Sequence, residues 1–222
     1  MTHSDDQGLV LPPRLAPIHV VIVPIFRKPE EKTATVAAAQ KLAAELRALP
    51  PDPWLGYEPL NVKVDDREQY QPGYKFNEWE LRGVPVRVEL GPKDLANNAC
   101  VLARRDLPGK EAKQMGVPLA AAPERIEKML REMQADLFNR AKKFRDDNSF
   151  EVNSYDEFKQ KIEDPGGFLW AHWDGTRETE DRIAAETKAT IRCIPFQRPK
   201  ESGKCMVTGK PSAGRVVFAK AY

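Results

Sequence analysis

Charged side chains in one stretch of the chain offer groups that could bind an unstacked nucleotide. The alternation over residues 84–90 predicts a strand with Arg87 and Glu89 on one face and valines on the other. Arginine donates several hydrogen bonds and glutamate accepts them, so this pair can read the edges of RNA bases. The same pattern also fits an ordinary solvated face, whose ion pairs contribute little to stability.

Neighbouring residues could complete such a site. Residues 73–82 predict a helix with aromatic side chains pointing inward and Glu80 at the edge of the buried stripe. Its polar face is expected to hold Lys75, Glu78 and Arg82. Gly91-Pro92 predicts a turn that presents Lys93 and Asp94. We therefore expect the charged groups of the helix, the strand and the turn to converge on one surface.

The elements that must position these residues follow the order strand–helix–strand–helix–strand. An apolar run at 18–25 predicts a buried strand, and residues 29–49 carry apolar residues at helical spacing. A short strand is expected at 61–64, and weaker strands are expected at 99–103 and 110–118. This order predicts an α/β fold in which helices flank a mixed, largely parallel sheet.

Two further parts are expected towards the end of the chain. Residues 123–145 predict a long amphipathic helix. The members of its apolar stripe are Ile126, Met129, Leu130, Met133, Leu137 and Phe144. Residues 149–222 alternate short helical and strand patterns, including a capping box at Ser154, and predict a smaller α/β domain.

Composition excludes several classes of protein. The chain has 222 residues and a formal net charge of +2, which leaves room for a local basic surface without predicting a strongly basic protein. No apolar run reaches the roughly 20 residues of a membrane-spanning helix, and no signal peptide is recognisable, so a cytoplasmic location and no membrane partner are expected. Cys100, Cys193 and Cys205 are too few for a disulfide scaffold, and all three are expected to be buried.

The charged stretch resembles the anticodon-binding domain of prolyl-tRNA synthetase, a class II aminoacyl-tRNA synthetase, in its eukaryote/archaeon-like form. The matching residues are Pro72-Gly-Tyr-Lys-Phe-x-x-Trp-Glu-x-x-Gly-Val-Pro-x-Arg-x-Glu-x-Gly-Pro-Lys-Asp94. Residues 5–17 resemble the end of the class II catalytic domain, where motif 3 ends in an arginine. The ending Arg215–Tyr222 resembles the family's C-terminal tyrosine. The resemblance spans essentially the whole chain and implies a C-terminal fragment that starts at motif 3.

The resemblance also implies a division into parts. Residues 1–17 would be the end of the catalytic domain, 18–120 the anticodon-binding domain, 121–148 a connecting helix and 149–222 the C-terminal domain. The full enzyme would use ATP and Mg²⁺ to join proline to its tRNA, and it would dimerise through its catalytic domain. This chain alone is expected to recognise the tRNA for proline without catalysing the reaction.

Site residues follow from the same resemblance. It implies anticodon contacts at Glu80, Arg87, Lys93 and Asp94, with Lys110 as a weaker candidate. The bases would be the two guanines of a proline anticodon, whose edges suit arginine donors and carboxylate acceptors. Arg14 resembles the motif 3 arginine and would bind ATP in the full enzyme.

The C-terminal domain carries the remains of a zinc motif. Residues 203–210 resemble a zinc knuckle whose second cysteine is replaced. The positions that match the four cysteines of zinc-binding relatives are Asp174, Thr179, Cys205 and Thr208. Threonine does not serve as a structural zinc ligand, so no zinc is expected. An improvised site from His172, Cys193 and Cys205 is a minor alternative.

Two other interpretations stay open. The chain could be a free-standing RNA-binding or regulatory module with an anticodon-binding fold, although the motif 3 resemblance argues against a module selected only for binding. It could also derive from a class II relative of different specificity, such as a threonyl or glycyl enzyme. Preference for the two guanines would separate that relative from the proline enzyme.

Overall fold

The fold is described from a computed structural model that covers residues 3–56, 59–196 and 201–220. Tyr222, which carries part of the family resemblance, lies outside these residues. The chain forms two compact units, residues 1–139 and 140–222. Within the described residues, no helix is long and apolar enough to cross a membrane.

A five-stranded sheet forms the centre of the first unit, in the order β4-β3-β5-β6-β7. The strands are β3 Val20–Pro24, β4 Val62–Val64, β5 Val86–Leu90, β6 Ala99–Arg104 and β7 Lys113–Pro118. β3 is parallel to β4 and β5, whereas β5–β6 and β6–β7 are antiparallel. The predicted mixed α/β class is confirmed, but the sheet is evenly mixed rather than largely parallel, because the connections after β5 and β6 are too short for crossovers.

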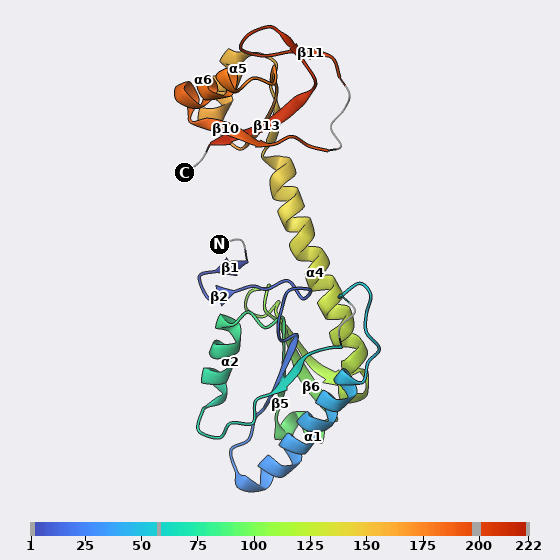
Figure 1. Cartoon of the computed structure of the whole chain (residues 1–222). Coiled ribbons are helices and arrows are strands. Elements are labelled where there is room, and N and C mark those ends of the chain that lie inside the picture. The colour runs from blue at the N-terminus through green and yellow to red at the C-terminus, as the bar shows by residue number, and fades with distance from the viewer. Residues whose placement is uncertain (1–2, 57–58, 197–200, 221–222) are drawn as a thin grey trace. The chain divides into compact units, whose positions relative to one another are not determined.

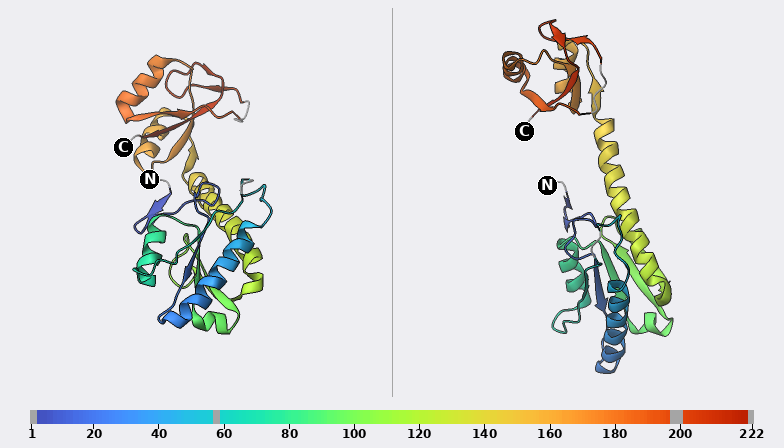
Figure 2. Two further views of the ribbon diagram at one scale, coloured as in Figure 1. Left: turned by 60° about the horizontal axis from the view of Figure 1, so that its bottom comes forward. Right: turned by 45° about the vertical axis from the view of Figure 1, so that its right-hand side comes forward.

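Helices cover the two faces of this sheet unequally. α1 (Pro29–Arg47) and the first half of α4 (Ala122–Asp147) pack on one face and enclose the main apolar core. α2 (Pro72–Leu81) packs on the other face, where Trp79 meets β3 residues. Figure 2, in its right-hand view, shows α2 on one side of the sheet and α1 and α4 on the other. α3 (Pro92–Ala96) is a single turn after β5, and η1 (Leu119–Ala121) leads into α4.

Buried charge fixes α2 to the end of β4. Asp65 is 1% exposed and accepts hydrogen bonds from Arg67 Nε at 2.7 Å and Trp79 Nε1 at 2.8 Å. Lys75 Nζ donates to the Asp65 backbone oxygen at 3.0 Å. Lys75 is buried, so its expected place on the polar face was wrong: its ammonium reaches inward to this acidic partner.

Burial raises the pKa of Asp65, but the hydrogen bonds from Arg67 and Trp79 outweigh it and hold the pKa at about 2. The carboxylate is therefore charged at neutral pH, and three side chains of the β4–α2 region depend on it.

The start of the chain packs against the end of α2. β1 (Ser4–Asp5) and β2 (Gly8–Leu9) form a small antiparallel pair. Gly8 has φ +122°, and a Cβ there would lie 2.6 Å from the Leu81 Cα. Only glycine permits this approach without displacing the backbone.

The long helix α4 departs from the predicted apolar stripe at its C-terminal end. Ile126, Met129, Leu130 and Met133 are buried as expected, but Phe144 is 67% exposed. Phe144 belongs to the second unit, and it is not a member of the core cluster of that unit.

The second unit is a smaller α/β layer with the strand order β10-β13-β9-β8. The strands are β8 Ser149–Glu151, β9 Phe168–His172, β10 Ala189–Cys193 and β13 Arg215–Lys220. α5 (Tyr155–Glu163) and α6 (Arg177–Thr187) supply Phe158, Ile162 and Ile183 to its core. The Glu157 N–H donates to Ser154 Oγ, which confirms the predicted helix start. β11 (Gly203–Lys204) and β12 (Pro211–Ser212) form a separate pair.

Replacing Asp65 tests the buried charge. We expect Asp65→Ala to lower the free energy of unfolding of the first unit by about 3–5 kcal/mol, because it leaves the buried Lys75 ammonium without its counter-charge and the buried Trp79 N–H without its acceptor. Asp66→Ala, an exposed neighbour, is the control and should change it by less than about 0.5 kcal/mol. Hydrogen exchange of β3 and β5 amides at increasing urea measures this unit separately.

The lowered pKa of Asp65 predicts how the stability of the first unit changes with pH. The folded pKa of about 2 lies below the ordinary 3.8, so this carboxylate stabilises the fold fully above about pH 4. The contribution is lost as the pH falls towards 2. Equal stability of Asp65→Ala and wild type at neutral pH would contradict the assignment.

Candidate nucleic-acid interface

Strand register places one row of side chains across the sheet face that α2 shares. Val21 pairs with Arg87, Arg87 with Ala103, and Ala103 with Lys113. Because residues paired in adjacent strands share a face, the small Ala103 side chain leaves a hollow between the two cations.

Arg87 is held within a chain of alternating charges. Its Nη1 donates to Glu80 Oε1 at 2.5 Å, and its Nη2 donates to Glu89 Oε1 at 3.0 Å. Lys113 Nζ lies 2.8 Å from the same Glu89 oxygen. The Arg87 guanidinium also lies 4.2 Å from the Phe76 ring centroid. Arg87 is only 8% exposed, so its guanidinium is fixed and desolvated rather than displayed on an open surface.

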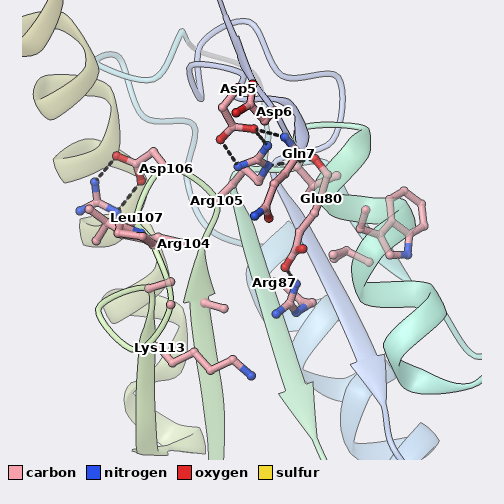
Figure 3. A pocket seen from close by; sticks show the side chains of 17 residues that line it. Asp5, Asp6, Gln7, Glu80, Arg87, Arg104, Arg105, Asp106, Leu107 and Lys113 are labelled. Atoms are coloured by element: carbon pink, nitrogen blue, oxygen red, sulfur yellow. Dashed lines mark hydrogen bonds and ion pairs between the residues drawn. The ribbon is translucent and has the colours of Figure 1, made fainter.

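Glu80, Arg87 and Lys113 line a cavity of about 460 Å³. Figure 3 shows Glu80 reaching from α2 to Arg87, with Lys113 extending from the neighbouring hairpin. At the rim, Arg105 donates to the Asp5 carboxylate at 2.6 and 2.8 Å and to the Glu80 backbone oxygen at 2.9 Å. The hydrogen bond from Arg105 lowers the pKa of Asp5 to about 2. The cavity therefore combines fixed donors with fixed acceptors.

The other implied anticodon residues lie elsewhere on the unit. Lys93 and Asp94 belong to α3, beyond the far end of β5, and Arg87 is about 10 Å along the strand from Leu90. Lys93 is exposed, whereas Asp94 Oδ2 accepts the Gly91 N–H at 2.9 Å and caps α3. Lys110 is exposed in the β6–β7 turn, next to the cavity-lining Gly109. The expected single cluster is thus divided, and only Glu80 and Arg87 are in direct contact.

Sequence reasoning missed Lys113, Arg105 and the bridging role of Glu89. The sequence predicted strands at 99–103 and 110–118, but not the register that brings Lys113 level with Arg87. Arg105 is held by an ion pair with Asp5, and local sequence patterns do not reveal a contact between residues so far apart in the chain.

Arg14 lies at a second cavity of the first unit, of about 620 Å³. Its side chain is exposed, and its backbone N–H donates to Gln134 Oε1 at 3.0 Å. His19 also lines this cavity, and its Nδ1 accepts the Asn61 N–H at 2.9 Å. Burial lowers the pKa of His19, which keeps the imidazole neutral at physiological pH.

In the second unit, the positions that resemble a zinc site form a hydrogen-bond network. Asp174 Oδ2 accepts from Thr179 Oγ1 at 3.0 Å and from Thr208 Oγ1 at 2.8 Å. Thr176 Oγ1 donates to the other carboxylate oxygen at 2.9 Å. Burial raises the pKa of Asp174, but the bonds from Thr208 and Thr176 prevail and hold it at about 2. One carboxylate with several hydroxyl donors does not fit a structural zinc ion.

The three cysteines are not arranged as the ligands of a metal site among the described residues. Cys205 and Cys100 are buried as expected, and burial raises the pKa of the Cys100 thiol to about 11. The expectation for Cys193 was wrong: it is exposed at the end of β10, an outer strand of its sheet. Among the residues that the structure describes, no three His, Cys, Asp or Glu side chains are grouped as a metal site would require.

Comparison with known proteins agrees with this organisation. Residues 19–129 match the family model described as "Anticodon binding domain", and residues 155–222 match "Prolyl-tRNA synthetase, C-terminal". The chain is 53% identical over all 222 residues to the proline–tRNA ligase of Chloroflexus aurantiacus, of which it covers 44%. It is 49% identical to that of Roseiflexus sp. (strain RS-1), with 44% covered, and 51% identical to that of Flavobacterium psychrophilum, with 42% covered.

The sheet, the charged cavity and the first match define an anticodon-binding α/β domain. The second match and the relatives identify the wider family. The chain belongs to the prolyl-tRNA synthetase family and corresponds to its C-terminal part. It spans less than half the length of the curated relatives it matches.

Replacing Asp174 tests the threonine network. We expect Asp174→Ala to destabilise the second unit by about 1–3 kcal/mol, because the hydroxyl donors lose their charged acceptor. Asp181→Ala, an exposed acid on α6, is the matched control. Hydrogen exchange of β9 and β13 amides measures the effect, and equal protection in both variants would contradict a stabilising role.

Proposed function

We propose that this chain is the tRNA-binding part of a proline–tRNA ligase and that it selects its tRNA by the anticodon. The observation that carries the proposal is the fixed Glu80–Arg87 pair at the cavity of an anticodon-binding domain. The pair presents a guanidinium donor and a carboxylate acceptor side by side.

Guanine suits this pair chemically. Arginine can donate to guanine O6 and N7, and a carboxylate can accept from the N1 and N2 groups. The guanidinium is already oriented by Glu89 and Phe76, so little side-chain freedom is lost on binding. Lys110, near the cavity in the β6–β7 turn, would bind phosphate and add affinity without base choice.

The anticodon residues implied by the family resemblance lie in two separate groups, which suggests a role for each group. Glu80 with Arg87 forms one donor–acceptor group, and Asp94 with Lys93 forms a second group at the far end of β5. We propose that each group takes one of the two guanines of the proline anticodon. Asp94 uses Oδ2 to cap α3, which fixes its carboxylate for this role.

The chemistry of the whole enzyme is proposed from the relatives, which are named proline–tRNA ligase. Such an enzyme would use ATP with Mg²⁺ to activate proline, which it then transfers to tRNA in the cytoplasm. Arg14 would contact ATP, and the catalytic domain would supply a dimer interface. This chain would contribute selection of the tRNA and would not catalyse the reaction alone.

Binding of RNA hairpins tests the assignment of the two groups. We expect Arg87→Lys to weaken binding to a proline anticodon hairpin by about 1–3 kcal/mol, about 5- to 150-fold in Kd, because lysine lacks the guanidinium fork. Hairpins with either guanine replaced by adenine should show that Arg87→Lys loses preference at one position. Lys93→Met should lose preference at the other.

Lys41→Ala is the control, because Lys41 is exposed on α1, which packs on the opposite sheet face. Wild-type binding that ignores both guanines would remove the proline assignment and favour a general RNA-binding module or a relative of other specificity. Loss of the same guanine preference in both variants would contradict the division into two groups.

We also propose that the second unit folds without zinc. Elemental analysis of the purified chain should find no stoichiometric zinc, and EDTA should leave its melting temperature unchanged. One tightly bound zinc ion per chain would overturn this proposal.

A further inference from the structure

Two tyrosine rings are stacked on the surface beside the start of α2. The ring centroids of Tyr70 and Tyr74 lie 4.5 Å apart, with an angle of 17° between the ring planes. Tyr70 is 36% exposed and Tyr74 is 53% exposed, so the pair keeps a large apolar and aromatic surface in contact with water. Neither ring belongs to the core clusters on the two faces of the sheet.

The pair is attached to the rigid part of the unit. The Arg67 guanidinium lies 4.9 Å from the centroid of the Tyr70 ring. Arg67 is itself held by Asp65 and by Glu78 Oε2, at 2.6 Å from its Nη2. The bonds to these carboxylates raise the pKa of Arg67 further, so the stacked pair always carries a cation beside it. Such a platform is organised before any ligand arrives.

The tyrosine pair lies at the same edge of the sheet as the second donor–acceptor group. β3, β4 and β5 are parallel, so the segments that follow them emerge at one edge of the sheet. The segment after β4 carries Tyr70 and leads into α2, and the segment after β5 carries Lys93 and Asp94. In Figure 1 the starts of α1 and α2 lie at the same end of the unit. Lys32 of α1 is paired with Glu68, which ties the segment after β4 to the start of α1.

We propose that Tyr70 and Tyr74 form a stacking platform for an unpaired base of the RNA loop. This proposal rests on the proposed function, because the loop would be positioned by Lys93 and Asp94. Stacking on aromatic rings is the general way in which proteins hold unstacked RNA bases, and it accepts any base. The exposed Tyr74 ring takes the base, and the fixed Arg67 guanidinium holds the Tyr70 ring that supports it.

A fluorescent hairpin tests the platform with the whole 222-residue chain. The probe is a proline anticodon hairpin with 2-aminopurine in place of an unpaired loop purine beside the anticodon. We expect wild-type binding to quench the fluorescence by stacking. Tyr74→Leu should bind about 5- to 100-fold more weakly without quenching, and Tyr74→Phe should retain both properties, because only the ring is needed. Trp54→Leu, another exposed aromatic residue of the unit, should bind as wild type does.

The outcomes separate the platform from the proposed function. If Tyr74→Leu binds with wild-type affinity and keeps the guanine preference, the platform is overturned and anticodon selection stands. If the wild-type chain has no preference for the guanines, the proposed function fails and the platform fails with it. Unchanged hydrogen exchange in β3 and β5 of Tyr74→Leu shows that the variant is folded.

Discussion

A single buried carboxylate holds α2 in place on the sheet of the first unit. Asp65 binds Arg67 and Trp79 through its side chain and Lys75 through its backbone oxygen. These bonds fix α2 to the end of β4, and α2 in turn supplies the acid that pairs with Arg87 and the ring beneath its guanidinium. A charge with several hydrogen-bond donors is stable inside a protein, and removal of the carboxylate would leave the Trp79 N–H without its acceptor and the nearby Lys75 ammonium without its counter-charge. The position of α2, and with it the Glu80–Arg87 pair, therefore depends on the bonds that Asp65 makes.

The charged side chains at the cavity of the first unit already neutralise one another. Arg87 lies between two carboxylates, and Lys113 completes the chain of charges. Burying a cation without such partners would cost several kcal/mol, so the acids are needed for folding as well as for the proposed recognition of bases. An incoming base must match bonds that the protein already makes, and a poor match leaves polar groups unpaired. Such a site favours discrimination between bases over tight binding to any RNA.

The parts that could be predicted from sequence were those set by local patterns. Alternation placed Arg87 and Glu89 on one face of β5, and the capping box at Ser154 marked the start of α5. Long-range contacts could not be read in this way. Val84 was expected on the same face as Val86 and Val88, but it packs with Trp79 on the other side of the sheet, because β5 begins only at Val86. Lys93 lies apart from Arg87 because β5 runs away from Arg87 towards the turn that carries Lys93. Lys75 points inward because it binds Asp65, which precedes the helix and therefore does not enter its periodic pattern.

The network around Asp174 has a chemical consequence for the second unit. Its bonds join a carboxylate to threonine hydroxyls, whereas a zinc knuckle depends on thiolates. Peroxides attack thiolates and release the metal they hold, but they leave hydroxyl and carboxylate groups intact. Because the Asp174 network contains no thiolate, we expect oxidation of the exposed Cys193, which lies outside the network, to leave these hydrogen bonds in place.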